Sequence, residues 1–531
     1  MRQISKIYFT SKGETFNNLI NQKNFKLFSR VPQKNLSFGY LCNNKKMKDS
    51  INIVWLKRDL RTTDHIPLYE AEKKQQNYII IYLFEPNQIN YDDYSLRHKQ
   101  FIYHSIIEMN KLLKKYNREV MIFNENADVV FDYLTSKYDV TNVISYQESG
   151  TKNSWLRDKK IKLLLKKNKT KWLEFEKQAV IRGSKDRNGW DKYWYSYANS
   201  EIINNNYSIN DYLYEKTPFD FSIKKNKELE KYPSQFQPAG EKYALKYLDS
   251  FISSRGKNYN IHISQPEKSR YSCGRLSTYL SWGNISVKQV YQKVKNSSNY
   301  KLNKRAFNSF LARLKWRSHF IQKFEVDCSY EHTCINRGYE KMEFENNDHL
   351  LERWKSGNTG FPLVDASMKC LINNGWLNFR MRAMLVSFLC HYLNQDWKRG
   401  VYHLAQLFLD YEPGIHYTQF QMQAGVTGIN SIRVYNPIKQ SKENDTNGVF
   451  IKKWIPELSK INHKIIHEPW ILTDIDLNGN VIPHIYRKPI ISTDFKNSSV
   501  RKKLWSLRKD SFVKEESKRI LNIHVRKKTS K

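Results

Sequence analysis

Short apolar runs rich in β-branched and aromatic residues recur through the first third of the chain and then stop. They lie at Ile51–Leu56, Tyr78–Phe84, Glu119–Phe123 and Val143–Tyr146. Segments with the apolar spacing of a helix lie between them, at Ile66–Lys74, Leu96–Lys115 and Ala127–Lys137. Strands of continuous hydrophobicity that alternate with helices are typical of a parallel sheet covered by helices on both faces. We therefore expect a parallel α/β domain over residues 50–184.

The strand signal fades from about residue 241, where helical spacing takes over. Helices are predicted at Tyr243–Ser253, Arg275–Leu280, Val287–Val294, Arg305–Phe324, His349–Trp354, Val364–Leu371, Phe379–Leu393 and Leu404–Leu409. Residues 185–240 are polar, aromatic and rich in Asn and Lys, which indicates a long connector between domains. The expected fold class is thus α/β followed by all-α, with a helical domain over 241–460. Residues 461–531 form a C-terminal segment with a basic tail, which we expect to be helical over Val500–Val525.

The first 46 residues differ from the rest of the chain. They carry nine Lys and Arg but one acidic residue, Glu14. This composition resembles an organelle transit peptide, and an upstream start codon with Met47 as the true start explains it equally well. The expected location is accordingly the cytoplasm, or an organelle if the extension is a transit peptide.

The charge balance is strongly basic, with 89 Lys and Arg against 52 Asp and Glu, a formal net charge of +37. Such a chain commonly meets an anionic partner such as nucleic acid, although a Lys-biased genome gives the same balance. The six cysteines contain no C-x-x-C pair and none follows Cys390, which argues against a disulfide scaffold and against a C-terminal iron–sulfur ligand set. No run approaches 18 apolar residues, so no transmembrane helix is predicted.

Common catalytic motifs are absent: there is no G-x-G-x-x-G, Walker A, H-E-x-x-H or G-x-S-x-G. The turn at 272–274, followed by a helix at Arg275–Leu280, could hold a phosphate, although a Ser before a helix is also a routine cap. Two Arg, at 380 and 382, and two acidic residues, Asp410 and Glu412, lie on separate apolar helices. Buried charges need partners, so two salt bridges between helices are the simpler reading of these four residues.

The motifs of the helical part resemble the photolyase/cryptochrome family. They are W-x-x-G-x-T-G-F-P-L-V-D-A-x-M at Trp354–Met368, Gly375-Trp376, Arg380-x-Arg382, Y-N-P-x-x-Q at 435–440, and the segment 450–458. Trp55-x-x-Arg58-Asp59-Leu60-Arg61-x-x-Asp64, the segment 275–283 and Leu314-Lys-Trp316-Arg317 also resemble the family. The resemblance runs from about Ile51 to Leu458. It implies an N-terminal antenna domain and a helical domain that binds FAD in a bent conformation.

The resemblance also implies the residues that contact FAD. They are Tyr259, Cys273, Gly274, Arg275, Leu276, Ser277, Arg317, Trp376, Arg382, Asp410, Glu412 and His416. The diphosphate is expected on Cys273–Ser277, where the family usually has Thr-Ser in place of Cys273-Gly274, so two side-chain hydroxyls are lost. His416 falls where the family carries the residue facing flavin N5, and its protonation could tune the flavin redox state.

The family's repair members split UV-induced pyrimidine dimers with an electron from light-excited reduced FAD, after the lesion is flipped out of the duplex. By resemblance the lesion pocket consists of Arg313, Trp316, Phe379, Arg380 and Met422. Arg313 replaces a carboxylate, Phe379 an Asn or His, and Met422 an aromatic of the common pattern, which leaves the lesion type open. We expect a photolyase acting on UV-damaged DNA as a monomer, with cyclobutane dimers favoured over (6-4) products. The alternative is a cryptochrome-like blue-light photoreceptor that signals through a protein partner.

The family's route for flavin photoreduction is altered in this chain. Trp397 matches the middle tryptophan of the family's triad, but Phe420 and Phe344 stand at the inner and outer positions, and phenylalanine is much harder to oxidise. Nearby tyrosines offer possible detours, although aromatics packed between helices are commonly core: Tyr392, Tyr402, Tyr411 and Tyr417. Trp316, Trp397 and His416 are the expected catalytic residues. The family's antenna chromophore, a folate, a deazaflavin or a lumazine, is left unassigned, and neither a metal site nor an iron–sulfur cluster is expected.

Overall fold

The computed structural model divides the chain into Met1–Met47 and Lys48–Lys531. It describes residues 48–211, 216–222, 226–473, 477, 481–494 and 499–525. The predicted N-terminal extension, residues 1–46, therefore lies outside the described residues.

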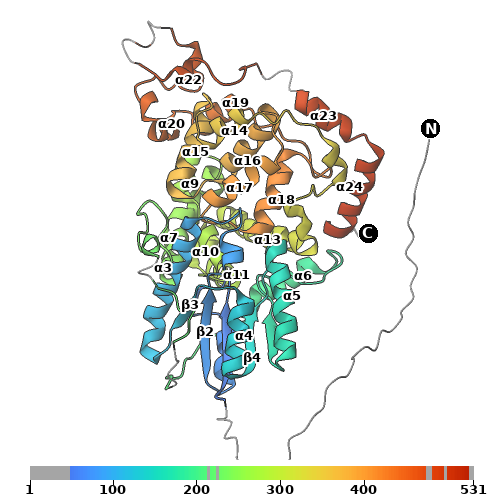
Figure 1. Cartoon of the computed structure of the whole chain (residues 1–531). Helices are drawn as coiled ribbons and strands as arrows, with labels where there is room; N and C mark the ends of the chain where they lie inside the picture. The colour runs from blue at the N-terminus through green and yellow to red at the C-terminus, as the bar shows by residue number, and fades with distance from the viewer. Residues whose placement is uncertain are drawn as a thin grey trace, which may run out of the picture. The chain divides into compact units, whose positions relative to one another are not determined.

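A five-stranded parallel sheet forms the N-terminal domain (Figure 1). Its strands are β1 (Ser50–Leu56), β2 (Tyr78–Leu83), β3 (Val120–Phe123), β4 (Asp139–Tyr146) and β5 (Lys171–Phe175), in the order β3-β2-β1-β4-β5. In the central register, Ile53 lies opposite Ile79 on one side and Val143 on the other. The predicted parallel α/β fold is confirmed. Strand β5 was not predicted, because the edge sequence Lys-Trp-Leu-Glu-Phe is only half-buried and contains no continuous apolar run.

Helices cover both faces of the sheet, as the buried residues show. On one face α4 (Ala127–Lys137) and α5 (Lys152–Lys167) pack against β1 and β2 side chains that include Trp55. On the other face α1 (Ile66–Lys73) and α3 (Leu96–Leu113) pack against side chains that include Val54. This second core continues without a break into the helical region, so α3 joins the two halves of the fold.

The rest of the described chain is helical, which confirms the all-α expectation. Two short elements, α2 (Pro86–Ile89) and η1 (Lys114–Tyr116), belong to the sheet domain between β2 and β3. The α-helices described after β5 are α6 (Trp190–Asn199), α7 (Glu241–Ser253), α8 (Tyr259–His262), α9 (Pro266–Ser272), α10 (Ser277–Trp282), α11 (Val287–Lys295), α12 (Ser298–Leu302), α13 (Lys304–Val326), α14 (Asp348–Lys355), α15 (Pro362–Asn374), α16 (Phe379–Ser387), α17 (Lys398–Leu407), α18 (Pro413–Ala424), α19 (Pro437–Asn444), α20 (Val449–Trp454), α22 (His484–Arg487), α23 (Ser499–Leu507) and α24 (Ser511–His524). Short turns complete the region: η3 (Lys227–Leu229), η4 (Arg255–Asn258), η5 (Cys328–Glu331), η6 (Arg337–Lys341), a π-helical turn η7 (Phe388–Tyr392), η8 (Pro456–Leu458) and η9 (Pro469–Ile471).

Several local predictions differ from the structure. The helix expected over Arg275–Leu280 begins at Ser277, because Arg275 lies in the left-handed region at φ +57°, and α5 was not predicted. The helix expected to run from Phe379 to Leu393 gives way to the π-helical turn η7 after Ser387. The basic tail is two helices, because the side chain of Asp510 accepts hydrogen bonds from the backbone N–H groups of Phe512 and Val513 and so starts a new helix. Helix α18 was not predicted at all, because it is buried on nearly every side and lacks a one-sided apolar pattern.

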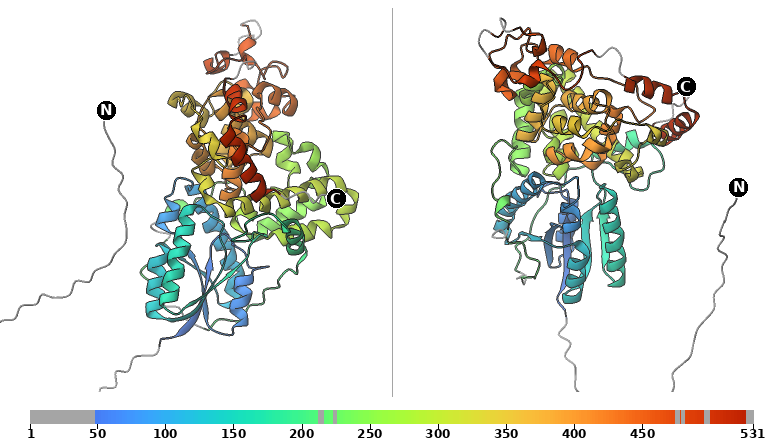
Figure 2. Two further views of the ribbon diagram at one scale, coloured as in Figure 1. Left: turned by 90° about the vertical axis from the view of Figure 1, so that its right-hand side faces the viewer. Right: turned by 45° about the horizontal axis from the view of Figure 1, so that its top comes forward.

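The tail helices lie against the helical domain (Figure 2). Arg519 donates a hydrogen bond to the carbonyl of Ile335 at 3.0 Å, and the hydroxyl of Tyr330 lies 2.9 Å from Nε2 of His524. Part of the basic tail is therefore held on the fold by specific contacts. Over the described residues, no helix combines the length and the apolar character needed to cross a membrane.

The loop after β1 docks the sheet onto the helical domain. The backbone N–H of Leu60 donates to the carbonyl of Trp282 at 3.0 Å, and Arg58 donates to the carbonyl of Tyr411 at 2.9 Å. Gly283, at φ +75°, makes this close approach possible, since a Cβ there would lie 2.3 Å from the carbonyl oxygen of Arg58. The carboxyl edge of the sheet is thus fixed against the loop that carries Asp410 and Glu412.

Candidate functional site

A cavity of about 320 Å³ opens between α10, α13, α16 and α18; we call it the helical cavity. Its wall is mainly apolar, with Leu280, Leu314, Val386, Leu404 and Phe408 among the lining side chains. A cavity needs only roughly 10–15 Å³ of such volume to hold one water molecule, so the space is far larger than a single ordered water needs. It has the character of a site for a large, partly aromatic ligand.

One ion pair stands on the wall of the helical cavity. Arg382 on α16 donates to both carboxylate oxygens of Asp410, at 2.9 and 2.8 Å, and its Nε donates to the carbonyl of Leu377. The guanidinium also lies 4.0 Å from the ring centre of Phe408. Because this bidentate geometry fixes both side chains, the pair offers a rigid charged edge beside an apolar surface.

A second ion pair lies partly behind the wall. Arg317 on α13 donates to Glu412 at 2.7 Å and to the carbonyl of Leu280 at 3.0 Å. Arg317 lines the cavity, whereas Glu412 does not. Of the two salt bridges considered from sequence, only Arg382–Asp410 forms among the described residues. Glu412 pairs with Arg317 instead, and Arg380 lies near Ser264 and Tyr435.

The segment Cys273–Ser277 lines one end of the helical cavity. Arg275 has φ +57°, in the left-handed region, and its guanidinium lies 4.1 Å from the ring centre of Trp376. Gly274 is close to Phe310, since a Cβ there would lie 3.1 Å from that ring. Because Gly274 has no side chain, its backbone atoms lie next to the cavity.

Three buried polar atoms on the cavity wall have no hydrogen-bond partner among the residues that the structure describes: Nε of Arg317, Oδ1 of Asn378 and Oε1 of Gln419. Buried polar groups in proteins are normally paired, so these atoms point to a polar ligand. The residues present fit the FAD that the resemblance implies, with a charged edge, an apolar ring-sized space and unsatisfied donors and acceptors.

His416 lines the cavity from α18. Its Nε2 lies 2.8 Å from the carbonyl of Val401, so Nε2 carries the proton and Nδ1 is left as an acceptor. Burial lowers the pKa of His416 to about 4, although the hydrogen bond to Val401 opposes the shift. The imidazole is therefore neutral at physiological pH, and the expectation that its protonation tunes the site does not hold there.

Two large aromatic side chains stand exposed at the mouth of the helical cavity. Trp316 is 50% exposed and Phe379 is 41% exposed, although both are lining residues. The guanidinium of Arg313 lies 4.9 Å from the ring centre of Trp316 and 5.8 Å from that of Phe379. A cation held between two exposed rings suits a flat ligand with polar edges and an anionic backbone.

The structure brings most of the residues singled out from sequence to one cavity. On the wall lie Tyr259, Cys273, Gly274, Arg275, Leu276, Ser277, Arg313, Trp316, Arg317, Trp376, Phe379, Arg382, Asp410 and His416. Glu412, Arg380, Met422 and Trp397 are not among the lining residues. Trp397 lies one layer behind the wall, with its ring centre 6.4 Å from that of Phe420, which does line the cavity.

Sequence reasoning missed several polar lining residues, including Asn378, Gln419 and Gln423. Asn378 precedes α16 and its side-chain amide donates to the carbonyl of Ile263, so it resembles an ordinary helix cap in sequence. Gln419 and Gln423 lie on α18, one turn apart. Recognising α18 as a helix that also carries His416 would have pointed to both.

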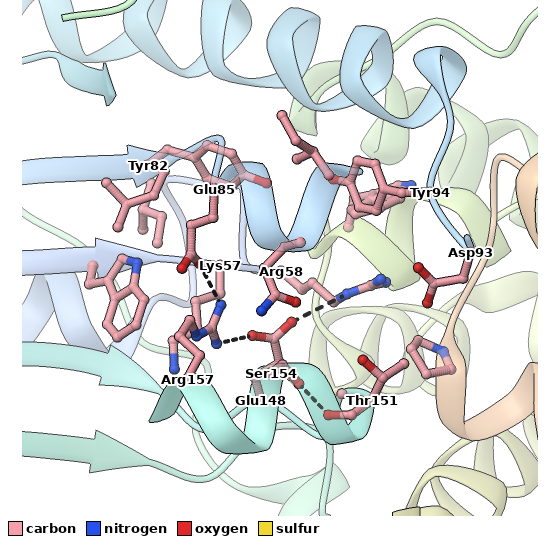
Figure 3. Close-up of a pocket in the computed structure, with 18 residues that line it drawn as sticks. Lys57, Arg58, Tyr82, Glu85, Asp93, Tyr94, Glu148, Thr151, Ser154 and Arg157 are labelled. Carbon is pink, nitrogen blue, oxygen red and sulfur yellow. Dashed lines mark hydrogen bonds and ion pairs between the residues drawn. The ribbon is translucent and has the colours of Figure 1, made fainter. Parts of the chain in front are cut away.

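A second, smaller cavity lies at the carboxyl edge of the sheet; we call it the sheet-edge cavity (Figure 3). Arg157 on α5 donates to Glu85 at 2.7 Å and to Glu148 at 2.6 Å, and Arg58 lies 3.6 Å from Glu148. Burial opposes ionisation of Glu148, but the cations Arg157, Lys57 and Arg58 outweigh it and lower its pKa to about 2. The cavity is therefore crossed by a permanently charged network.

The sheet-edge cavity does not fit an aromatic second chromophore. Its volume is about 70 Å³, room for a few water molecules. None of its lining residues has a buried polar side-chain atom without a partner within the described structure. A chromophore there would have to displace buried ion pairs, and we assign none to this cavity.

Comparison with known proteins gives two family matches. Residues 52–194 match the DNA photolyase family, and residues 310–506 match the FAD binding domain of DNA photolyase. The chain is 25% identical over 448 residues to a deoxyribodipyrimidine photo-lyase of Alkalihalophilus pseudofirmus, covering 80% of this chain and 91% of that protein. It is 24% identical over 466 residues to a cryptochrome DASH of Synechocystis, covering 79% and 90%.

The fold also matches a solved structure, a bacterial class III photolyase from Agrobacterium tumefaciens. The TM-score is 0.76 at 21% identity, covering 89% of this chain and all of the other. At this identity the likeness concerns the fold. It agrees with the order of a parallel α/β domain and a helical domain described above.

Proposed function

Because the chain belongs to the DNA photolyase/cryptochrome family and carries its FAD-binding domain, we propose that it repairs UV-induced pyrimidine dimers in DNA with light. The observation that carries the proposal is the helical cavity, which combines a ring-sized apolar space with an aromatic mouth open to solvent. A cofactor buried at the base of such a cavity and a flipped-out dinucleotide at its mouth would be in contact.

The residues that would hold FAD follow from the site. Arg382 and Asp410 would position the edge of the ring system, the segment Cys273–Ser277 would hold the diphosphate through its backbone, and Arg317 would supply its free Nε. When bound and reduced, FAD supplies the light-driven electron that opens the dimer. The protein's contribution is to orient the cofactor, exclude water with the apolar wall and hold a neutral His416 beside it.

The mouth residues would hold the lesion. Trp316 and Phe379 would stack on the flipped bases, and Arg313 would contact their carbonyl oxygens or a phosphate. Neither Met422 nor Arg380 is part of this wall, so their predicted lesion contacts are not used in the proposal. Cyclobutane dimers are the favoured substrate, and (6-4) products are the alternative.

The experiment is a repair assay with two lesions. The holoprotein is reduced chemically and mixed with one oligonucleotide that bears a cyclobutane dimer or one that bears a (6-4) product, in blue light and in darkness. We expect light-dependent loss of the cyclobutane dimer only. Failure to repair either lesion, with FAD bound and reduced, would instead support a cryptochrome-like photoreceptor.

DNA binding provides the supporting measurement. The net charge of +37 predicts strong salt-dependent binding to any DNA, which by itself says nothing about repair. A repair enzyme should keep its preference for damaged over undamaged DNA as salt rises. A basic photoreceptor should show no such preference.

A further inference from the structure

Four tyrosines whose rings are in successive contact lead from the helical cavity towards the surface. We call Tyr411, Tyr417, Tyr402 and Tyr91 the tyrosine file. His416 on the cavity wall lies 5.4 Å from the ring of Tyr411 and 5.5 Å from that of Tyr417, measured between ring centres. Tyr411 and Tyr417 lie 6.5 Å apart, Tyr417 and Tyr402 6.3 Å, and Tyr402 and Tyr91 6.2 Å. Each step is a direct aromatic contact, with no other side chain needed between the rings.

The burial of these tyrosines changes along the file. Tyr411 and Tyr417 are buried, whereas Tyr402 and Tyr91 are partly exposed. The outer two come from different parts of the chain, α17 and the loop after α2, and meet edge to face. The file therefore connects the cavity wall with solvent.

Three of the four phenols, those of Tyr411, Tyr402 and Tyr91, also have a proton acceptor close by. Tyr411 donates to Asp93 at 2.5 Å and lies 3.4 Å from the hydroxyl of Tyr417. The hydroxyl of Tyr402 lies 3.5 Å from Glu331 and 3.4 Å from Nδ1 of His332, and the hydroxyl of Tyr91 lies 3.5 Å from Nε2 of His332. Acceptors matter because a phenol becomes a strong acid when it loses an electron.

Asp93 is well suited to take the first proton. Burial raises its pKa to about 7, although the hydrogen bond from Tyr411 opposes the shift, so it is a stronger base than an exposed aspartate. It also lines the sheet-edge cavity, which has room for a few water molecules (Figure 3). A proton accepted by Asp93 can pass on to that water.

The tryptophan route differs in its proton acceptor. One ring, that of Phe420, separates Trp397 from the cavity, as the ring of His416 separates Tyr411 from it. The indole N–H of Trp397 points to Sγ of Cys334 at 3.4 Å, not to a basic group. Because Tyr411 donates to the carboxylate of Asp93, it is the better electron donor on chemical grounds.

We propose that Tyr411, Tyr417, Tyr402 and Tyr91 form an electron relay that photoreduces oxidised FAD bound in the helical cavity. The inference rests on the function proposed above. One electron would pass from Tyr411 to light-excited oxidised FAD, and the phenol proton to Asp93. The Tyr411 radical then takes a hydrogen atom from the hydroxyl of Tyr417. The Tyr417 radical is restored by an electron from Tyr402 and by the proton that Asp93 returns through the hydroxyl of Tyr411.

The outer steps restore the relay. Tyr402 gives its proton to Glu331 and takes it back when it is reduced in turn by Tyr91. The proton of Tyr91 passes to His332 and from there to solvent. A small thiol in solution returns a hydrogen atom to Tyr91, and two of the resulting sulfur radicals combine as a disulfide. In sum, FAD gains one electron, and the thiol loses one electron and one proton.

The test measures photoreduction of oxidised holoprotein, without DNA and with excess thiol. Tyr411→Phe keeps the ring but removes the hydroxyl, and we expect its photoreduction to be about tenfold or more slower, with loss of the transient tyrosyl-radical spectrum. Tyr392→Phe is the matched control, a half-buried tyrosine stacked near Phe388 and outside the file, and it should keep the wild-type rate and radical signal. Trp397→Phe should also keep the tyrosyl signal.

Asp93→Asn provides a second variant in case Tyr411→Phe fails to retain FAD. It keeps all four phenols but removes the first proton acceptor, and it should slow radical formation by a similar factor. Wild-type photoreduction without a tyrosyl radical, or loss of photoreduction in Trp397→Phe but not in Tyr411→Phe, would overturn the relay. Repair by chemically reduced wild-type protein does not depend on photoreduction, so failure of the relay and failure of the repair function are separate results.

Discussion

The sheet-edge cavity and the helical cavity are built on opposite principles. The sheet-edge cavity is small, and the cation of Arg157 is shared among Glu85, Glu148 and Asp158. The helical cavity is several times larger, mainly apolar, and leaves polar atoms of Arg317, Asn378 and Gln419 unpaired. Polar groups that satisfy one another stabilise the fold, whereas polar groups left unpaired around an apolar cavity are available to a ligand.

The largest expected effect lies in the sheet-edge cavity. Arg157→Ala would leave three acidic side chains buried without their shared cation, and we expect the free energy of unfolding to fall by about 3–5 kcal/mol. Chemical denaturation measures this loss. Lys160→Ala on the same helix removes only an exposed ion pair with Asp128 and should change stability by less than about 1 kcal/mol. Equal losses of stability in the two variants would contradict the structural role proposed for this network.

A substitution in the helical cavity should reduce both FAD binding and the stability of the protein. Asp410→Ala leaves Arg382 without its bidentate partner, so we expect loss of bound FAD and a destabilisation of about 3 kcal/mol. The measurements are the FAD content of the purified protein and its chemical denaturation. Asp249→Ala, which breaks an exposed ion pair with Lys293, should retain FAD fully. Normal FAD content in Asp410→Ala would show that this pair does not hold the cofactor.

Substitutions at the mouth of the helical cavity should weaken DNA binding without affecting FAD binding. Trp316→Ala removes one stacking surface, worth about 1–3 kcal/mol per base, so we expect roughly 5- to 100-fold weaker binding to damaged DNA with FAD retained. Competition with undamaged DNA isolates the preference for the lesion. Trp505→Ala, an exposed tryptophan on the tail helix α23, should leave that preference unchanged. An undiminished preference in Trp316→Ala would move the lesion site elsewhere.

The smallest expected effect is the pH response of His416. Its pKa of about 4 in the folded protein lies below the usual 6.5, because burial disfavours the charged imidazole. The unfolded chain therefore binds this proton first, and the stability contributed by the neutral ring is present above about pH 6.5 and is lost as pH falls towards 4. Histidine NMR should show no titration of His416 between pH 6 and 8. A midpoint near 6.5 would contradict the buried, neutral ring.

How far the sequence predicted the fold differs between the two halves. The strands β1, β2 and β4 are buried, apolar and regular, so their positions were apparent from residue type alone. Helix α18 was not predicted, because burial on nearly all sides removes the apolar stripe that marks a surface helix. That same helix carries His416, Gln419 and Phe420 to the cavity, so the missed element is a functional one.

The residues of the candidate site were predicted largely from motifs, but the hydrogen bonds and ion pairs between them were not. Residue patterns indicated that Arg382, Asp410 and Glu412 belong to one site, but only the structure pairs Glu412 with Arg317. The network around Arg157 joins its near neighbours Glu148 and Asp158 to Glu85, 72 residues earlier, a long-range contact that local patterns do not predict. The tyrosine file likewise depends on contacts between the loop after α2 and helices more than 300 residues later.

The most direct test of the contrast between the two cavities is the chromophore content of the purified holoprotein. Extraction and quantification against protein concentration should give one FAD per chain and no second chromophore, with the FAD absent from Asp410→Ala and present in Asp249→Ala. A stoichiometric second chromophore that is lost in Arg157→Ala would contradict the account, because it would mean that the sheet-edge cavity opens to bind a ligand.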